Sequence, residues 1–428
     1  MSKGSQPGRW AIAIAGVLSL ATAMGIGRFA FTPLLPMMLS EKSIDLPAAS
    51  WLASANYLGY LVGALLCTFQ PWIWRRLAAL RGGRALPPVN APAMMRGGLI
   101  ATIILTAGMA LPATATWPLW RFASGVASAF VFVYTSGWAL GQLARLGVPS
   151  MGSLIYMGPG AGILISGLMA SVMVSWHWPA GAGWMIFSML ALAFTVPVAR
   201  TLRRHETANT ASAPTAASAA PASGSSVSAP AASLVNLRTG KGEITLLAFA
   251  YGIAGFGYII TATFLPVIAR QSIPGSPWLD LFWPIFGSGV MLGAFIASRI
   301  PPGGDNRLLL AGCYFVQAAG IILGLVSPSA AGFAVGSLLL GLPFTAITFF
   351  AMQEVRRLRP ASAPSYMGLL TALYGLGQIA GPPLVAVLLR HSVNAAQGFT
   401  LSLEIAAGSL VVGAVVFLAM VKAYPVVR

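Results

Sequence analysis

The stretch GIGRFAFTPLLP, residues 25–36, places one arginine, Arg28, inside an otherwise apolar segment. The apolar run from about residue 10 to residue 39 can cross a bilayer, which takes about 20 residues in a helix. A cationic side chain near the bilayer centre costs about 3 kcal/mol or more, so it normally faces a protein interior or a watery cavity. We therefore expect Arg28 to face a cavity with a ligand. The alternative is an arginine that snorkels or pairs with helix carbonyls and only stabilises the fold.

The composition predicts a polytopic membrane protein. Hydrophobic residues make up 57% of the 428 residues, charged residues make up 8%, and the mean hydropathy is +0.81, whereas soluble domains carry about 25% charged residues. Cys67 and Cys313 lie inside apolar runs, which indicates neither a disulfide framework nor a metal site. Lys3 and Arg9 precede the first apolar run as in a signal peptide, but no small-residue cleavage site closes a short apolar region. We predict an uncleaved first span.

Apolar stretches separated by Pro, Gly or charged residues predict an all-α membrane protein with twelve transmembrane helices, arranged as two six-helix bundles. The predicted spans lie near residues 10–39, 50–70, 95–114, 116–143, 150–175, 179–199, 243–270, 277–300, 307–326, 329–357, 363–390 and 397–422. Some exceed the minimum length of a span, which fits tilted helices or helices that extend beyond the membrane.

The basic residues predict the orientation of the chain. If the N-terminus is cytoplasmic, twenty Lys and Arg residues fall on the inner side, three (Lys42, Arg270 and Arg390) on the outer side, and Arg28 and Arg121 in the membrane. The positive-inside rule then predicts an integral, multi-pass protein of the plasma (inner) membrane with both termini cytoplasmic. This distribution accounts for the net charge of +17 without a nucleic-acid partner. The same charges would contact anionic lipid headgroups.

The middle of the chain predicts a linker. Between residues 204 and 236 the composition collapses to Ala, Ser, Thr and Pro with almost no large apolar side chains. Such a segment cannot bury enough surface to fold, so we predict a flexible cytoplasmic tether. The predicted domains are an N-terminal six-helix bundle of residues 1–204, a linker of residues 205–238 and a C-terminal six-helix bundle of residues 239–428.

The two halves repeat. Five residues of the first half recur 230 positions later in the second half. Gly25, Gly27, Pro36, Gly59 and Gly63 correspond to Gly255, Gly257, Pro266, Gly289 and Gly293, respectively. Gly125 and Met151-Gly152 recur at an offset of 216, as Gly341 and Met367-Gly368. A difference in loop length between the halves explains the change of offset. Six helices followed by six related helices in the same orientation form a parallel repeat, which places a substrate site near the midplane between the halves.

These features resemble the major facilitator superfamily, whose members have six plus six spans and a central cytoplasmic linker. The stretch GIGRFAFTPLLPMM (residues 25–38) resembles the first helix of the YbfB/YjiJ-type branch of that superfamily. RFASG (residues 121–125) resembles the Arg-x-x-x-Gly element of the fourth helix, and GPGAG (residues 158–162) resembles the Gly-Pro-rich element of its antiporters. The resemblance implies a secondary transporter that works by alternating access, with Gly158, Pro159 and Gly160 in a conformational or gating role.

One motif departs from the superfamily. The loop after the second helix usually carries a gating Asp within a Gly-x-x-x-Asp-x-x-Gly-Arg element, but residues 71–96 contain no acidic residue. Gating by that Asp therefore cannot be transferred to this chain, and Asp305-Asn306-Arg307 in the second half is at best a weak substitute.

Candidate substrate-binding residues lie on predicted helix faces. Arg28 and Thr32 are four residues apart, and Arg121, Ser128 and Thr135 are seven apart, so each set shares a face. Two membrane arginines with few membrane acids favour an anionic or carboxylate-bearing substrate, because a guanidinium can bind a carboxylate with two parallel hydrogen bonds. For Arg121, a structural or coupling role is an open alternative.

The second half offers neutral polar and aromatic groups that suit the body of an amphipathic anion. Tyr258 corresponds to Arg28 in the repeat, and Ser337 corresponds to Arg121. The other candidates are Gln353 in the tenth span and Tyr374 and Gln378 in the eleventh. We expect Tyr258, Tyr374 and Gln378 to contact the substrate; each single aromatic residue could instead face lipid or the core.

Coupling to an ion requires a group that titrates or binds a cation. Of the eight acidic residues, only Glu404 falls clearly within a span, near its outer end. Glu404 is therefore the first candidate for proton coupling and Arg121 the second, with facilitated diffusion and exchange left open. We expect a monomer that needs no cofactor and that binds a small-molecule substrate and a coupling proton.

Three other functions compete with carrying an organic anion. A proton antiporter that exports lipophilic cationic drugs usually needs a buried acid in its cavity, but the GPGAG element keeps this alternative open. An enzyme would need paired acids, a histidine cluster or a nucleophile with its base, which three scattered histidines and sparse acids do not offer. A scaffold without transport is disfavoured by the repeat with its membrane arginines. No Gly-x-x-x-x-Gly-Lys-[Ser/Thr] loop occurs, so primary transport by this chain is not indicated.

Overall fold

The structure is a computed structural model that describes residues 7–81, 89–211, 241–276, 278–301, 304–359 and 363–425. Regular structure within these ranges is helical throughout. Eleven segments are long and apolar enough to cross a membrane, and α9 (Phe282–Arg299) occupies the place of the twelfth in chain order. The predicted all-helical membrane fold is confirmed.

The first half contains six spans, of which the first and fifth are interrupted. Its elements are α1 (Arg9–Leu20), η1 (Ala21–Ile26), α2 (Phe31–Ser40), α3 (Leu46–Leu80), α4 (Ala91–Gly108), η2 (Thr114–Thr116), α5 (Trp117–Arg145), η3 (Pro149–Met157), α6 (Gly158–Ser175) and α7 (Ala180–Ala211). Side chains cap two of these helices, because Asp45 and Asn90 accept hydrogen bonds from the backbone N–H groups of Ala48 and Ala93.

The second half contains the other six spans. Its elements are α8 (Lys241–Ser272), α9, α10 (Asn306–Val326), α11 (Ala330–Gly341), α12 (Pro343–Leu358), α13 (Ala363–His391) and α14 (Ala395–Ala423). α11 and α12 together form one span, which is divided immediately before Pro343 because proline has no N–H to continue the helical ladder.

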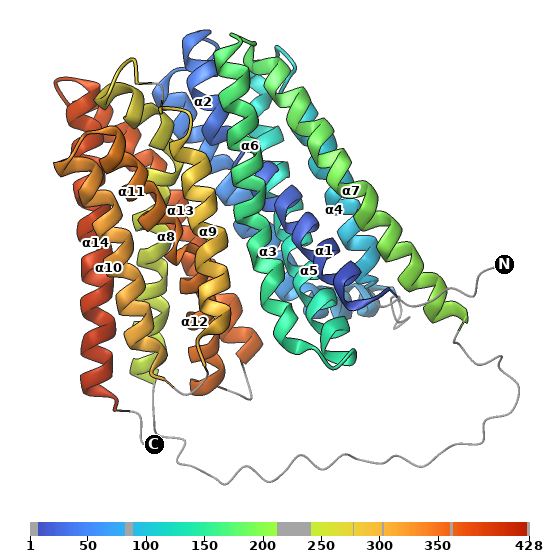
Figure 1. Cartoon of the computed structure of the whole chain (residues 1–428). Coiled ribbons are helices and arrows are strands. Elements are labelled where there is room, and N and C mark those ends of the chain that lie inside the picture. Colours follow the sequence, from blue (N-terminus) through green and yellow to red (C-terminus); the bar gives the residue numbers. More distant parts are fainter. Residues whose placement is uncertain are drawn as a thin grey trace, which may run out of the picture.

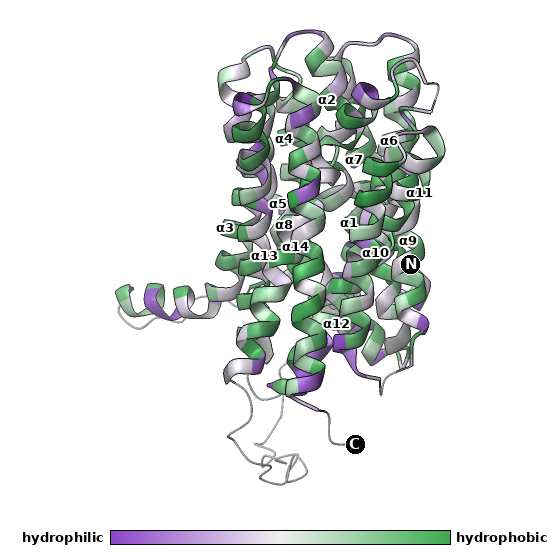
Figure 2. Ribbon diagram, turned by 90° about the vertical axis from the view of Figure 1, so that its left-hand side faces the viewer, coloured by the Kyte–Doolittle hydropathy of each residue, from purple (hydrophilic) through white to green (hydrophobic). Residues whose placement is uncertain are grey.

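The outer faces of the helices are apolar over most of their length. Figure 2 shows green ribbon along much of the bundle and hydrophilic purple concentrated toward its ends and connections. Large hydrophobic side chains such as Ile104, Met189 and Val412 are more than half exposed. Such a surface suits the hydrocarbon interior of a bilayer and would aggregate in water.

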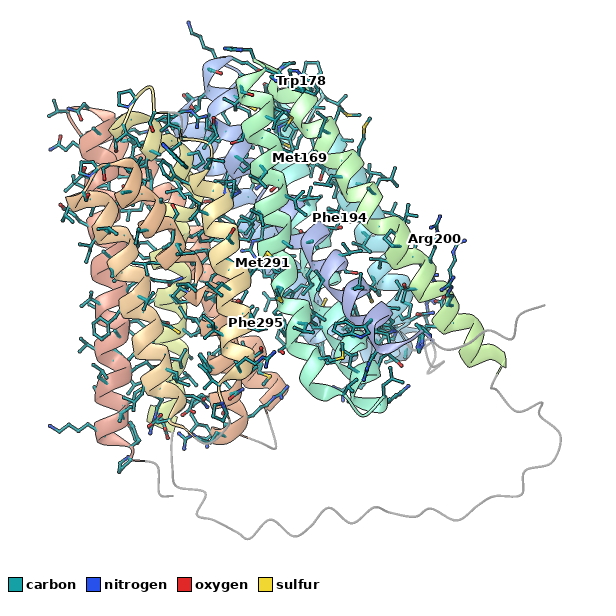
Figure 3. All side chains as sticks on the ribbon, viewed as in Figure 1. Met169, Trp178, Phe194, Arg200, Met291 and Phe295 are labelled. Atoms are coloured by element: carbon teal, nitrogen blue, oxygen red, sulfur yellow. The ribbon has the colours of Figure 1, made fainter. Side chains whose placement is uncertain are left out.

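One end of the bundle carries most of the arginines. We call it the basic end: it is the end where α1 begins and α14 ends, and it is the lower end in Figure 1. Arginines lie there at the ends of α5 (Arg145), α9 (Arg299) and α12 (Arg356 and Arg357). Arg200, toward the end of α7, is exposed and points away from the bundle (Figure 3).

The repeat predicted from glycine spacing corresponds to two equivalent helix crossings. α3 crosses α5 so closely that a Cβ on Gly125 would lie 2.1 Å from the carbonyl oxygen of Asn56. α9 crosses the end of α11 in the same way, and a Cβ on Gly341 would lie 2.2 Å from the carbonyl oxygen of Phe286. Phe286 follows Asn56 by 230 residues and Gly341 follows Gly125 by 216. The same offsets therefore relate both partners of each crossing.

The halves contact each other away from the basic end and separate toward it (Figure 1). α3 packs on α13, α6 on α9, and α2 on α8. Hydrogen bonds cross the boundary from Thr32 to the carbonyl oxygen of Ala262 (3.1 Å) and from Ser54 to that of Ile379 (3.1 Å). These contacts hold the two halves together.

The predicted linker differs in its first residues. α7 continues to Ala211, so residues 205–211 of the predicted linker are helical. His205 is buried there, with its ring 5.9 Å from that of Trp138, and Arg96 binds Glu206 through two hydrogen bonds of 2.8 Å. These contacts extend the helix beyond the last apolar residues of the span. The rest of the predicted linker lies outside the described residues.

Candidate functional site

A cavity of about 520 Å³ lies between the two halves. Its size falls within the range of small-molecule sites, roughly 300–1,000 Å³. Its lining comes from both halves and includes Arg28, Tyr60, Phe132, Tyr156, Pro159, Tyr251, Tyr258, Phe344, Thr348, Phe349, Gln353, Arg356, Thr371, Tyr374 and Gln378. Most of these groups are aromatic or neutral polar, and the two charged ones are both arginines.

Arg28 reaches the cavity because the first span is interrupted. The segment η1 is π-helical, with the N–H of Gly27 bonded to the carbonyl of Thr22 (2.9 Å) and that of Phe29 to Met24 (3.1 Å). Pro33 has no N–H, so the carbonyl of Phe29 accepts from Thr32 instead of continuing an α-helix. The turn of residues 27–30 between η1 and α2 therefore places Arg28 at a bend, a common location for functional groups.

The guanidinium of Arg28 connects the two halves. It donates a hydrogen bond to Oε1 of Gln378 on α13, and the Gln378 amide donates to the hydroxyl of Tyr258 on α8. The ring of Tyr60 lies 4.0 Å from the guanidinium carbon, a cation–π contact. Arg28 is 3% exposed and its Nε has no partner. Among the described residues no carboxylate pairs with Arg28. Its guanidinium is therefore available to bind an anion.

Arg121 is the second buried arginine, and it binds backbone. Its guanidinium donates to the carbonyl oxygens of Arg28 (3.1 Å) and Gly27 (3.5 Å) and lies 4.9 Å from the ring of Phe31. Ser124 donates to Gly27 (2.7 Å) and Ser128 to Ala23 (2.7 Å). This face of α5 therefore binds carbonyls of the interrupted first span. Arg121 and Ser128 do not belong to the cavity lining.

The second half supplies aromatic rings to the cavity. The rings of Tyr258 and Tyr374 stack with centroids 5.8 Å apart, and Tyr251 lies 4.8 Å from Tyr374. The Tyr251 hydroxyl donates to Thr348 (3.0 Å). The three rings in contact form an apolar wall beside Arg28, and their hydroxyl groups remain at its edges. Such a wall suits a ligand with a charged head and an apolar body.

The remaining predicted site residues lie in several places. Thr32 binds the carbonyl of Ala262 across the halves and does not line the cavity. Pro159 lines the cavity, while Gly160 contacts α9 so closely that a Cβ on it would lie 2.7 Å from the carbonyl oxygen of Gly287. Met291, one turn further along α9, also packs on Gly160 and is labelled in Figure 3 beside Phe295. Glu404 is exposed on the outer surface of α14 and does not reach the cavity.

Reasoning from the sequence alone missed several lining residues. Tyr60, Tyr156 and Thr348 sit among many similar residues in apolar spans, and no signal in one sequence separates them from core. Arg356 is one of the twenty basic residues that the orientation argument places on the inner side, and its place at the end of a span does not mark it as a lining residue. A detectable signal was the spacing of Thr345, Gln353 and Arg356, which share one helix face.

None of the eight acidic residues, all of which the structure describes, lines the cavity. Three of them join a buried charge cluster at the basic end of the second half. Arg307, 0% exposed, donates to Glu243 (3.0 Å), to Asp305 (2.8 Å) and to the carbonyls of Met420 and Tyr424. The cluster thus joins the ends of α8, α10 and α14.

The charge cluster also includes residues of α12, and one of its acids, Asp305, lies outside the membrane-spanning segments. Arg357 donates to Glu354 and to Glu243 (3.0 Å), and Arg307 lies 3.8 Å from Glu354. Burial alone would raise the pKa of the Asp305 carboxyl, but the hydrogen bonds and the charge of Arg307 hold that pKa below its ordinary value. The ion pair of Asp305 and Arg307 therefore stabilises the packing of helices within the second half.

Metal chemistry has no visible site in the described part of the chain. No three His, Cys, Asp or Glu residues gather there closely enough to hold an ion. Cys67 and Cys313 are both free thiols.

Comparisons with known proteins agree with this architecture. Residues 20–418 match the family model described as "Uncharacterised MFS-type transporter YbfB". A crystal structure of a mutant of the nucleoside transporter NupG superposes with a TM-score of 0.68 at 14% identity, covering 96% of this chain and 99% of that one. The D-xylose-proton symporter superposes with a TM-score of 0.68 at 13% identity, covering 95% and 97%.

At such low identities the structural matches establish the fold alone, and among curated proteins none matches this sequence. The family match spans nearly the whole chain, from the first interrupted span to the last helix. The chain therefore belongs to the YbfB-type family of major facilitator superfamily transporters.

Proposed function

We propose that this protein carries small organic anions across the membrane by alternating access, with the substrate's carboxylate bound by Arg28. The observation that carries the proposal is the buried guanidinium of Arg28, which lines the cavity, donates to a neutral amide and has no acidic partner in the described structure. A carboxylate can accept two parallel hydrogen bonds from such a group and compensate its charge. An uncharged ligand would leave the charge uncompensated.

The rest of the cavity suits an apolar body attached to that carboxylate. Tyr60 covers the guanidinium of Arg28 from the first half, and the wall of Tyr251, Tyr258 and Tyr374 faces it from the second. Aromatic faces bind planar and aliphatic groups without demanding hydrogen bonds. Aromatic and branched aliphatic monocarboxylates are the substrate class that we propose.

We place the basic end on the cytoplasmic side of the plasma membrane. This orientation puts the helix-end arginines of α5, α9 and α12 where the positive-inside rule requires them. The cavity, whose lining extends from Arg28 to Ser298 and Arg356 near the basic ends of α9 and α12, is then open to the cytoplasm.

A carrier coupled to protons through its own side chains needs a titrating group in the cavity. The acidic residues of this chain all lie outside the cavity lining, and Glu404 is exposed on the outer surface of α14. We therefore propose that the anion's own gradient, or exchange for a second anion, drives transport. The same absence of an acid disfavours export of cationic drugs, which would meet two arginines.

Ligand-induced stabilisation of the purified protein tests the proposal. A ligand that binds only the folded state stabilises it by about 2.7 kcal/mol at about 100 times its Kd. Benzoate and 3-methylbutanoate should raise the melting temperature, whereas uridine, D-xylose and tetraphenylphosphonium should not. Arg28→Gln should abolish the effect of the carboxylates.

Arg299→Gln is the matched control, because Arg299 lies over the ring of Phe295 and does not line the cavity. It should keep the full response to benzoate. Stabilisation by uridine or D-xylose that persists in Arg28→Gln would instead assign an uncharged substrate and leave Arg28 with a structural role.

A further inference from the structure

One face of α12 lines the cavity from its depth to the basic end. The lining positions on this helix are Phe344, Thr345, Thr348, Phe349, Met352, Gln353 and Arg356. Their spacing of three or four residues keeps them on one side of an α-helix. Thr345 and Arg356 are separated by about 16 Å along the axis, at a rise of about 1.5 Å per residue. The face therefore runs along the cavity to its open end.

Three polar groups on this face have no hydrogen-bond partner in the described structure, whereas the fourth, the Thr348 hydroxyl, accepts from Tyr251. The buried hydroxyl of Thr345 makes no hydrogen bond, and neither the amide of Gln353 nor the guanidinium of Arg356 bonds to a described residue. The neighbouring arginines are both engaged. Arg357 binds Glu354 and Glu243, and Arg359 donates to the carbonyl of Leu358.

The surroundings of Arg356 do not neutralise it. It lines the mouth of the cavity together with Ser298 of α9, and it lies close enough to Tyr156 of the first half to interact with it electrostatically. No acidic residue shares this lining. An arginine needed only for membrane orientation could lie exposed and point away from the bundle, as Arg200 does (Figure 3). Arg356 instead borders the cavity that leads to Arg28.

We propose that Arg356 and Gln353 form a second anion-binding position at the mouth of the cavity, which receives the substrate's carboxylate before it reaches Arg28. Both side chains carry N–H donors, and their separation of three residues places them on adjacent turns of α12. The substrate class is the organic carboxylate of the proposed function, on which this inference rests. Thr345 offers a hydroxyl between the two positions.

Two positions solve a physical problem of entry. A carboxylate that moved straight from water to the depth of the cavity would lose its hydration before reaching a compensating charge. Positive charge at the mouth raises the local concentration of anions, and confinement between low-dielectric walls strengthens this effect. Arg356 therefore acts on anions in the cavity whether or not they are carried.

Charged thiol reagents measure this effect without a known substrate. In a background of Cys67→Ser and Cys313→Ser, Thr371→Cys provides a reporter on α13 that lines the cavity between its mouth and Gln378. The probes are methanethiosulfonate ethylsulfonate, an anion, and methanethiosulfonate ethyltrimethylammonium, a cation. Arg356→Gln should lower the ratio of the anionic to the cationic reaction rate about five- to tenfold, because the local potential acts on the two probes in opposite directions.

Two further variants separate a binding position from general surface charge. Arg299→Gln removes an arginine from the same end but outside the cavity, and it should change the ratio less than about twofold. Arg356→Lys should keep most of the ratio. Equal losses in Arg356→Gln and Arg299→Gln would overturn the inference, and so would an unchanged ratio in Arg356→Gln.

The experiment also separates this inference from the proposed function. With benzoate as the ligand, Arg356→Gln should raise the apparent Kd obtained from thermal stabilisation about threefold to tenfold, whereas Arg28→Gln should abolish the stabilisation. If benzoate and 3-methylbutanoate bind the unmodified protein but Arg356→Gln leaves the reagent ratio and the Kd unchanged, only the second position is wrong. If neither carboxylate binds, the proposed function fails while the reagent ratio still tests Arg356.

Discussion

At the scale of single residues, the two membrane arginines serve different purposes. Arg121 donates to the carbonyls of Gly27 and Arg28, whereas Arg28 donates across the cavity to Gln378. Their place in apolar spans predicted that both are buried. It could not assign their roles, because these depend on which carbonyls the π-helical segment η1 exposes toward α5. A single sequence carries no signal for that rearrangement.

Substitution of the two arginines should therefore have different consequences. Arg121→Gln should lower the melting temperature by several degrees, because the buried carbonyl of Arg28 loses its donor, which costs about 1–3 kcal/mol, while that of Gly27 keeps Ser124. Arg28→Gln should leave the melting temperature within about one degree of the unmodified protein and remove only the response to carboxylates, since the lost bond to Gln378 is replaceable by water in the cavity. Differential scanning fluorimetry without ligand checks both. Equal melting temperatures would mean that Arg121 does not support the bend.

At the scale of helices, the charge cluster around Arg307 joins the basic ends of α8, α10, α12 and α14. Its acids are Glu243, Asp305 and Glu354, and its second base is Arg357. The folded protein holds the pKa of Asp305 below its ordinary value. A lowered pKa contributes stability that is present above the unfolded-state pKa, about 3.9, and is lost as the pH falls through the folded-state value.

The melting temperature should consequently fall as the pH is lowered below about 4. Asp305→Asn should melt below the unmodified protein at pH 7, and this difference should shrink as the pH falls below about 4, because the carboxyl is then protonated in the unfolded state before it is protonated in the folded state. Glu404→Gln, which alters an exposed carboxylate far from the cluster, should show no such convergence. A gap between Asp305→Asn and the unmodified protein that stays constant from pH 7 to pH 3 would contradict the assignment.

Helix contacts also show what the sequence could predict. The glycine offsets of 230 and 216 predicted a repeat of the two halves, and the structure places Gly125 and Gly341 at equivalent crossings. A glycine is needed at both positions because a Cβ would collide with the neighbouring backbone. The role of α12 was not predictable in the same way. The predicted span of residues 329–357 places Arg356 at a helix end, but only the structure shows that this residue shares the cavity-lining face of Gln353.

At the scale of the whole molecule, the contact of α6 with α9 closes one end of the cavity. Gly160 and Gly287 meet there, and a Cβ on Gly287 would lie 2.6 Å from the backbone nitrogen of Leu164 and 2.9 Å from the carbonyl oxygen of Gly160. These neighbours are backbone atoms, which cannot move aside as a flexible side chain can. Alternating access requires that this end opens when the basic end closes. A larger residue at Gly287 should therefore favour the opposite conformation.

Gly287→Val should shift the protein away from the state open at the basic end. Overpacking costs about 1–3 kcal/mol, so the cysteine of Thr371→Cys should react at least about fivefold more slowly with thiol reagents. Ser54→Cys, whose native hydroxyl bonds across the closed end to Ile379, should react faster. Gly312→Val is the control, because a Cβ on Gly312 meets nothing within 4 Å. Faster reaction at both reporters would indicate unfolding, and unchanged rates at both would show that the contact of Gly160 with Gly287 does not control the conformation.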